Sequence, residues 1–275
     1  MAVTRAYRLG LIGAGNMGAA LLRGFFKSGL LQPEQVLICE ADAARQAAVG
    51  AELGVSAAPA LALVAECEAV ILAVKSQTLP ELLGGLKGTF ASDQVVISIA
   101  AGISLARLRK LIGPDVPLVR VMPNLLCTVG ESASASACSP EVSAEQQAWV
   151  GELLGSVGLA LPVDEGLLDA VTGLSGSGPA FAAVFCEALA DGGVAAGLPR
   201  AVAVKLAAQT LKGAGRWILE QGSPAQLKDA VTSPKGTTIA GLEVLEREGL
   251  RGAALQAVLA AARRSAELGK DSEER

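Results

Sequence analysis

Two segments near opposite ends of the chain carry residue types suited to anion binding. The first is 9–18, where an aliphatic run leads into the pattern Gly13-x-Gly15-x-x-Gly18. Such a turn between a strand and a helix places backbone N–H groups against a dinucleotide pyrophosphate. The second is 231–241, where hydroxyl residues and a glycine precede an expected helix N-terminus, a natural seat for a small carboxylate. Together the two segments predict a reductase with a nicotinamide cofactor.

Each glycine of the first pattern has its own task. Gly13 permits the tight turn, Gly15 lets the backbone approach the pyrophosphate, and Gly18 lets the next helix pack on the sheet. Glycine-rich turns also occur by chance and in methyltransferases, but this one follows an aliphatic strand and opens an alanine-rich helix. The turn therefore predicts cofactor binding by Gly13, Ala14, Gly15, Asn16, Met17 and Gly18.

Three other turns are expected at the same edge of the sheet. Glu40 ends the second expected strand, where an acid binds the ribose hydroxyls of NAD and repels the extra phosphate of NADP. Arg45 could offset this repulsion, so the cofactor is NADPH or NADH, and Glu40 could also be a solvated residue at a helix entry. Ala73-Val74-Lys75 and Ala100-Ala101-Gly102 each end a strand, where ligands of open α/β sheets collect. Either turn alone is also explained by packing.

Alternating strand and helix patterns supply the elements that position these turns. Strands are expected at 8–12, 36–39, 69–74, 95–99 and 118–121, and weaker ones at 131–137 and 157–163, with helices between them that include one capped by Ser143. The alternation predicts a parallel sheet covered on both faces. After Asp164 only helices are expected, at 179–196, 201–221, 224–231, 238–248 and 252–268, followed by a frayed end at 269–275. The predicted fold class is α/β, with a Rossmann-type dinucleotide-binding domain at 1–164 followed by an all-helical oligomerisation domain at 165–275.

Composition excludes several classes of function. The 275 residues carry a net charge of −4 without a basic block, so nucleic acid is not an expected partner. No histidine is present, which excludes a histidine base, a Ser-His-Asp triad and a histidine-ligated metal site, and no metal site is predicted. Five cysteines without a CxxC spacing favour reduced thiols in the cytoplasm. The longest uncharged stretch, 170–186, is too short and too glycine-rich to span a membrane.

With these residues in place, the chain resembles the pyrroline-5-carboxylate reductase family over nearly its full length. The resemblance rests on Gly13–Gly18, Ala73–Lys75, Ala100–Gly102, Arg120–Asn124, Leu174–Ala180 and Ser233–Thr238. It implies NAD(P)H-dependent reduction of 1-pyrroline-5-carboxylate to L-proline, the last step of proline biosynthesis. It also implies a homodimer or a higher, ring-like homo-oligomer in which the helical domain of one subunit completes the site of its neighbour.

The resemblance also assigns the substrate site to Ser233, Gly236, Thr237 and Thr238. Backbone N–H groups of Gly236, Thr237 and Thr238 would take the carboxylate, and the Thr238 hydroxyl would face the imine nitrogen as the catalytic group. Lys235 stands where the family usually has Gly, and at φ > 0 it would carry strain of about 1–2 kcal/mol. Two other departures lie at Ser76, where the family usually has Pro, and at Ala60, where many members carry a cofactor-contacting Asn.

Two other classes of protein stay open from the sequence. A hydroxy-acid dehydrogenase or imine reductase would use a Lys or Asp of the helical half, for which Lys205 and Asp191 are available. A non-catalytic nucleotide-sensing subunit would need the glycine turn but not the hydroxyl-rich one. The helical half is also apolar around much of its circumference, which implies either an identical partner or packing on the N-terminal domain. Residues that show this are Val184, Phe185, Leu189, Val194, Leu206 and Leu211.

Overall fold

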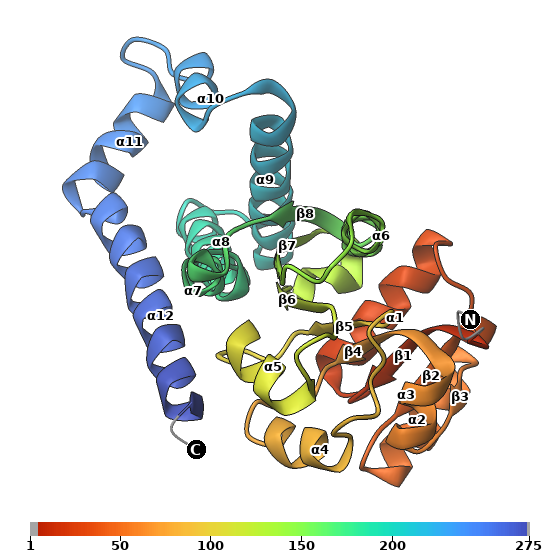
Figure 1. Cartoon of the computed structure of the whole chain (residues 1–275). Helices are drawn as coiled ribbons and strands as arrows, with labels where there is room; N and C mark the ends of the chain where they lie inside the picture. The colour runs from red at the N-terminus through yellow and green to blue at the C-terminus, as the bar shows by residue number, and fades with distance from the viewer. Residues whose placement is uncertain (1–4, 274–275) are drawn as a thin grey trace. The chain divides into compact units, whose positions relative to one another are not determined.

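A mixed sheet organises the first part of the chain in this computed structural model, which describes residues 5–273 (Figure 1). Among these residues, the strand order is β3-β2-β1-β4-β5-β6-β7-β8. The central order 3-2-1-4-5-6 is that of a Rossmann sheet, with its switch point between β1 and β4. The strands are β1 (Tyr7–Ile12), β2 (Val36–Cys39), β3 (Ser56–Ala57), β4 (Cys67–Leu72), β5 (Val95–Ser98), β6 (Leu118–Met122), β7 (Ser132–Cys138) and β8 (Gly158–Pro162).

The sheet is mainly parallel, as predicted, and one strand pair among the described residues departs from this. β6 and β7 run antiparallel, whereas β7 and β8 run parallel. A parallel pair needs a crossover of about a dozen residues or more. The connection after Met122 is instead a short 3-10 helix, η2 (Leu125–Val129), followed by Gly130 at φ 77°, and it reverses the chain.

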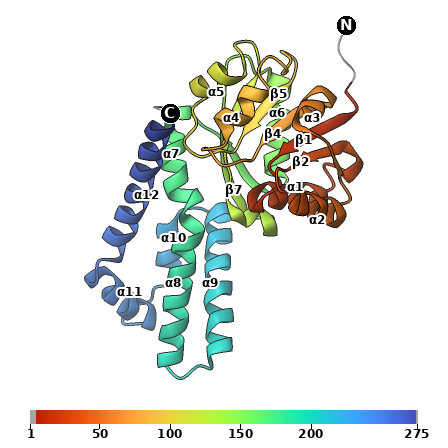
Figure 2. The ribbon, with the colours of Figure 1, turned by 90° about the horizontal axis from the view of Figure 1, so that it is seen from below.

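Helices cover both faces of the sheet, as predicted (Figure 2). Alternate strand residues feed two apolar cores, so that Ile71 joins one core and its neighbours Val70 and Leu72 join the other. The first core takes residues from α1 (Asn16–Ser28), α2 (Ala43–Leu53) and α6 (Ala144–Gly155), and the second from α3 (Ala60–Glu66), α4 (Leu79–Gly85) and α5 (Leu105–Ile112). The sequence did not predict α3 or β3, because both are too short to show a clear period.

The rest of the chain is helical, as predicted, but its last helix is longer than expected. It comprises α7 (Leu168–Val171), the π-helix η4 (Thr172–Gly176), α8 (Gly178–Ala195), α9 (Arg200–Gln221), α10 (Pro224–Ala230), α11 (Thr237–Arg247) and α12 (Leu250–Glu273). α12 extends beyond the predicted end at 268 to Glu273, and Gly269 packs against Gly102, while fraying at the end of the chain stays a prediction. Residues 274–275 lie outside the described part.

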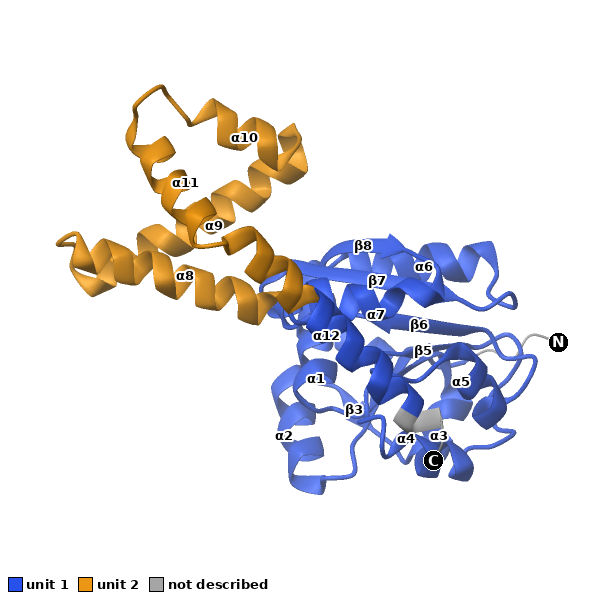
Figure 3. Ribbon diagram, turned by 90° about the vertical axis from the view of Figure 1, so that its left-hand side faces the viewer, with its two compact units in different colours: residues 1–177, 259–275 blue, residues 178–258 orange. Residues whose placement is uncertain are grey.

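The chain forms two compact units, 1–177 with 259–275, and 178–258 (Figure 3). These units are defined by compactness, so they do not test the predicted domain boundary at residue 164, which stays a prediction. In the helical unit, the buried apolar cluster among the described residues consists of Ala190, Ala203 and Ala207. Larger side chains such as Val184 and Leu206 are 67% and 54% exposed. No helix within 5–273 is long and apolar enough to cross a membrane.

Candidate active site

The glycine turn after β1 has the geometry that its sequence predicted. Gly13 has φ 98°, and a Cβ there would lie 2.7 Å from the carbonyl of Ala73. A Cβ at Gly18 would lie 2.3 Å from the Gly13 oxygen, so the glycine lets α1 pack closely on the turn. Gly15 differs, because no atom of the described residues lies within 4 Å of a Cβ built there. This open space over the turn fits a pyrophosphate that approaches the backbone.

The helix that follows presents donors to the same space. Gly15 is the N-cap of α1, and its carbonyl accepts the N–H of Ala19 at 2.9 Å. The N–H groups of Asn16, Met17 and Gly18 precede this first helical hydrogen bond and have no acceptor within the helix. The helix dipole favours an anion at this position.

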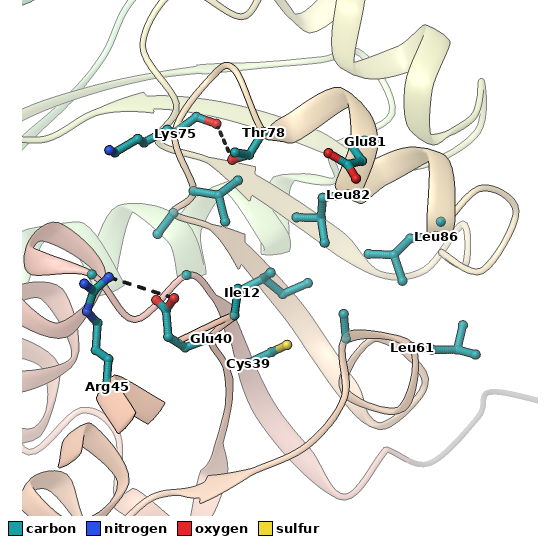
Figure 4. Close-up of a pocket in the computed structure, with 17 residues that line it drawn as sticks. Ile12, Cys39, Glu40, Arg45, Leu61, Lys75, Thr78, Glu81, Leu82 and Leu86 are labelled. Atoms are coloured by element: carbon teal, nitrogen blue, oxygen red, sulfur yellow. Dashed lines mark hydrogen bonds and ion pairs between the residues drawn. The ribbon is translucent and has the colours of Figure 1, made fainter. Parts of the chain in front are cut away.

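A cavity of about 780 Å³ lies beside the turn at the carboxyl ends of β1, β2 and β4 (Figure 4). Leu61, Leu82 and Leu86 give it an apolar wall that suits a flat aromatic base. Glu40 and Arg45 lie on the other side, with Glu40 Oε1 3.9 Å from Arg45 Nη1. The lining comprises Ile12, Gly13, Gly15, Cys39, Glu40, Ala41, Arg45, Ala60, Leu61, Ala73, Val74, Lys75, Thr78, Glu81, Leu82, Gly85 and Leu86.

Glu40 is held in place by the start of α2. Its Oε1 accepts the N–H of Asp42 at 3.2 Å, and its own N–H donates to Gln46 Oε1 at 3.0 Å. The Glu40 side chain is only 11% exposed, whereas Arg45 is 52% exposed. The cavity therefore offers a largely buried carboxylate for ribose hydroxyls and a more exposed guanidinium that could meet a phosphate. Beside them, burial raises the pKa of the Cys39 thiol, which keeps that thiol protonated.

The turn Ala73–Lys75 lies just beyond its strand rather than within it. β4 ends at Leu72, two residues earlier than predicted, because its last pair is with Ile12 and β1 then turns away at Gly13. The N–H of Ala73 still donates to Ile12 O at 2.8 Å, which fixes the turn against the glycine loop.

A second, smaller cavity of about 310 Å³ continues along the strand ends. It shares Ala73, Val74 and Lys75 with the first cavity and adds Met17 and Ala100. Its other lining residues are Ser76, Gln77, Ile99, Ala101, Met122 and Pro123. Together the two cavities follow the strand ends from β2 to β6. This arrangement suits a dinucleotide, with one half in each cavity.

Most of the predicted cofactor residues thus come together. Ala14, Asn16 and Gly18 line neither cavity: Ala14 is buried under the turn, and the other two contribute backbone at the start of α1. Two of the departures from the family pattern also lie at the cofactor crevice, Ala60 in the larger cavity and Ser76 in the smaller one.

Sequence reasoning missed the apolar wall and the far end of the crevice. Leu82 and Leu86 lie four residues apart near the end of α4, a spacing that could have indicated one helix face. Leu61 could not be found, because it belongs to the unpredicted α3. Met122 is the last residue of β6 and Pro123 follows it, and their place at a strand carboxyl end was a usable signal.

The hydroxyl-rich segment forms a type II β-turn at the start of α11. Ser233 O accepts the N–H of Gly236 at 3.0 Å, with Pro234 and Lys235 at the two central positions. Lys235 has φ 57°, and it is the one non-glycine residue within 5–273 with positive φ. A type II turn requires positive φ at this position, which is normally Gly or Asn. Lys235 therefore meets the condition of positive φ under which strain was expected there.

The turn also revises one expectation about the substrate. The Gly236 N–H already donates to Ser233 O, so it is not available to a carboxylate. Gly236 is the N-cap of α11, and Ala240 N–H donates to its carbonyl at 3.4 Å. The N–H groups of Thr237 and Thr238 precede this bond and have no acceptor within the helix, so these two donors can take a carboxylate.

The alternative catalytic residues of the helical half lie in ordinary surroundings. Asp191 on α8 pairs with Arg200 on α9, and both side chains are more than half exposed. Lys205 is exposed on α9. These contacts explain Asp191 as part of a surface ion pair that joins two helices.

Comparison with known proteins agrees with this arrangement. The family model described as pyrroline-5-carboxylate reductase dimerisation matches residues 165–268, and that described as NADP oxidoreductase, coenzyme F420-dependent, matches 8–102. A pyrroline-5-carboxylate reductase of Methanosarcina acetivorans is 45% identical over 96% of this chain and 98% of its own length. One of Synechocystis sp. is 46% identical with the same coverage. The crystal structure of Plasmodium falciparum pyrroline carboxylate reductase with NADP bound is 28% identical, with a TM-score of 0.84, over 97% of this chain and 100% of that one.

Proposed function

Because this chain belongs to the pyrroline-5-carboxylate reductase family, we propose that its strand-end crevice and its Ser233–Thr238 turn together reduce 1-pyrroline-5-carboxylate to L-proline with NAD(P)H. The resemblance predicted from the motifs is confirmed by these relatives. The assignment to residues rests on the N–H groups of Thr237 and Thr238 at the start of α11, which lie beside a hydroxyl-rich turn and have no acceptor among the described residues.

The residues of the turn would hold the substrate by its carboxylate. Thr237 and Thr238 offer two backbone N–H groups at the positive end of the α11 dipole. Ser233 supports this geometry, since a Cβ at Gly236 would lie 2.3 Å from its Oγ and the glycine leaves room for that hydroxyl. Fixing the carboxylate fixes the ring, so most of the catalysis is positioning.

Thr238 is the proposed catalytic residue. Its side chain is half-buried on the first turn of α11, where its hydroxyl would hydrogen-bond the imine nitrogen and relay the proton that this nitrogen takes up. A bound dihydronicotinamide supplies the hydride for the ring carbon. A protonated cyclic imine is already electrophilic, so a chain without histidine can catalyse its reduction.

In the crevice, we assign the adenosine half of the cofactor to the larger cavity and the nicotinamide half to the smaller one. Gly13–Gly18 would hold the pyrophosphate, Glu40 the ribose hydroxyls, and Ala73–Lys75 with Ala100 the nicotinamide side. The fixed carboxylate of Glu40 supports use of NADH at a rate at least comparable to NADPH.

The enzyme is a homo-oligomer, and we propose a homodimer or a ring of dimers in which one subunit's helical half completes its neighbour's site. The exposed apolar side chains of the helical unit support this assembly.

We also propose a division into domains at 1–164 and 165–275, which the family match from residue 165 supports. A cytoplasmic location is proposed as well, and the five unpaired cysteines support it.

Oxidation of NADH and of NADPH in the presence of pyrroline-5-carboxylate tests the function directly. Thr238→Ala should lower kcat/KM by an amount equivalent to about 2–4 kcal/mol, with dinucleotide affinity unchanged. Thr232→Ala is the matched control, because the Thr232 hydroxyl is already bound to Lys228 O at 2.6 Å. Full activity of Thr238→Ala together with an inactive Lys205→Ala would favour a hydroxy-acid dehydrogenase instead.

A further inference from the structure

We propose that the C-terminal turns of α12 hold the loop that binds the nicotinamide end of the cofactor, which makes Ser265 and Gly269 positioning residues. The inference rests on the proposed function, since it takes the Ala100–Ala101 side of the smaller cavity as the nicotinamide end. α12 begins in the helical unit and its residues from 259 onward belong to the unit that contains the sheet (Figure 3).

The first observation is a close approach between two glycines. Gly102 is buried at φ 74°, and a Cβ there would lie 3.0 Å from Gly269 N and 3.1 Å from Gly269 Cα. The backbone of the loop therefore rests on the backbone of α12 without a side chain between them. Ala100 and Ala101, which line the cavity, directly precede Gly102. A shift of α12 at Gly269 would displace the cavity wall.

The second observation is a partly buried polar network that fixes α12. Ser265 is 5% exposed, and its Oγ donates to Asp169 Oδ1 at 2.7 Å. Asp169 Oδ1 lies 4.0 Å from Arg120 Nη2, and Arg120 Nη1 lies 3.2 Å from Glu165 Oε1. Glu165 Oε1 accepts the N–H of Leu105 at 2.7 Å, at the far end of the same loop. The network thus joins α12, α7 and β6 to the loop.

Two further anchors lie at the start of the loop. Ile99 N–H donates to Leu72 O at 3.1 Å, and Ala100 N–H donates to Ser98 Oγ at 3.3 Å. The stretch between Ala100 and Leu105 is the part against which Gly269 packs. We infer that α12 sets how far this stretch projects into the smaller cavity, while the hydrogen bonds at both ends set the path of its backbone.

Hydride transfer should depend on how far the loop projects into the cavity, because the loop would position the nicotinamide ring. A misplacement of about 1 Å can cost on the order of 100-fold in rate. A Cβ at Gly269 would already lie 3.4 Å from Gly102 O, so the branches of a valine would push the loop away. The adenosine and pyrophosphate sites lie on other elements, β2, α3, α4 and the start of α1. A change at α12 should therefore weaken ligands that carry nicotinamide and spare ADP-ribose, which lacks it.

The test compares Gly269→Val with Gly252→Val in the full-length protein. Gly252 lies on the same helix, and no described atom is within 4 Å of a Cβ there, so it reproduces the cost of valine in a helix without the contact. Gly269→Val should lower kcat/KM for the reduced cofactor by about tenfold or more, with the inhibition constant of ADP-ribose within about twofold of wild type. Equal behaviour of the two variants, or a parallel loss of ADP-ribose affinity, would overturn the proposal.

A second pair of variants serves if Gly269→Val does not fold. Ser265→Ala removes the hydroxyl that binds Asp169, and Ser265→Thr retains it. The alanine variant should show the same selective loss and the threonine variant should recover most of it; loss in neither would refute the network's role. Fluorescence titration with NADPH and ADP-ribose gives the same comparison without turnover, so a failure of the proposed reaction stays distinguishable from a failure of this inference.

Discussion

Replacing Lys235 separates two properties that the turn combines, backbone strain and positive charge. The residue has φ 57° and an exposed side chain, and it lies two residues before the Thr237 N–H that we assign to the substrate carboxylate. Among the described residues its ammonium has no ion-pair partner. Lys235→Gly removes strain and charge, Lys235→Gln removes only the charge, and Lys235→Arg keeps both.

The structure sets the size of each effect. A left-handed backbone costs a side-chain-bearing residue about 1–2 kcal/mol, so the glycine variant should raise the melting temperature by a few degrees. A solvated ammonium about 4 Å from a carboxylate contributes about 1 kcal/mol, equivalent to about fivefold in KM. The Gln and Gly variants should therefore both raise the KM for pyrroline-5-carboxylate by about two- to fivefold, and the Arg variant should not.

The assay is initial-rate kinetics at low and high salt together with thermal unfolding of the four proteins. The difference in KM should shrink at high ionic strength, because salt screens an exposed charge. Lys212→Gln, on an exposed position of α9, controls for a change in net charge. A wild-type KM for Lys235→Gln at low salt would refute the electrostatic argument. A glycine variant no more stable than wild type would refute the strain argument.

Three further outcomes follow from the crevice and its surroundings. Gly15→Val should abolish NAD(P)H binding in a fluorescence titration without loss of fold, because Gly15 has an ordinary φ of −71° and open space at its Cβ. Glu40→Ala should improve the KM for NADPH relative to NADH by about 3- to 10-fold, since it removes the acid that repels the extra phosphate and one of the two carboxylate partners of Arg45, the other being Asp42; an unchanged ratio would make Glu40 a surface acid. The hydrogen bond from Arg109 lowers the pKa of Glu141 to about 2, so this carboxylate stabilises the fold above its ordinary pKa and loses that effect as the pH falls toward 2. Glu141→Gln should therefore destabilise the protein at pH 7 in urea unfolding, with the difference from wild type shrinking below about pH 4.5.

The sequence predicted the fold of the sheet-containing half well because its signals are local. Strand periodicity and the turn Gly13–Gly18 fix both the sheet edge and the helix that follows it. Glu40 and Ala100 could be placed because they lie just after the ends of β2 and β5, and parallel strands end at one edge. The apolar wall at Leu61 could not, since it depends on a seven-residue helix whose composition gives no period.

Contacts between distant segments explain most of what sequence reasoning missed. The sequence placed the end of the last helix at 268, and it could not show the tertiary contacts that α12 makes at Ser265 and Gly269. The antiparallel β7 follows from a short connection after Met122, and strand composition alone carries no direction. The engaged N–H of Gly236 is likewise a property of the closed turn rather than of its residue types.

Gly13 and Lys235 show why one position of a motif accepts substitution and another does not. Both have positive φ, at 98° and 57°. At Gly13 a Cβ would also lie 2.7 Å from the backbone of Ala73, which two hydrogen-bonded strands hold in place, so the conformational cost adds to a collision that nothing can relieve. Lys235 faces solvent and meets only the conformational cost, and its turn is closed by the bond between Ser233 O and Gly236 N–H and stiffened by Pro234. A motif glycine is therefore indispensable where space and backbone angle both demand it, and replaceable where the angle alone does.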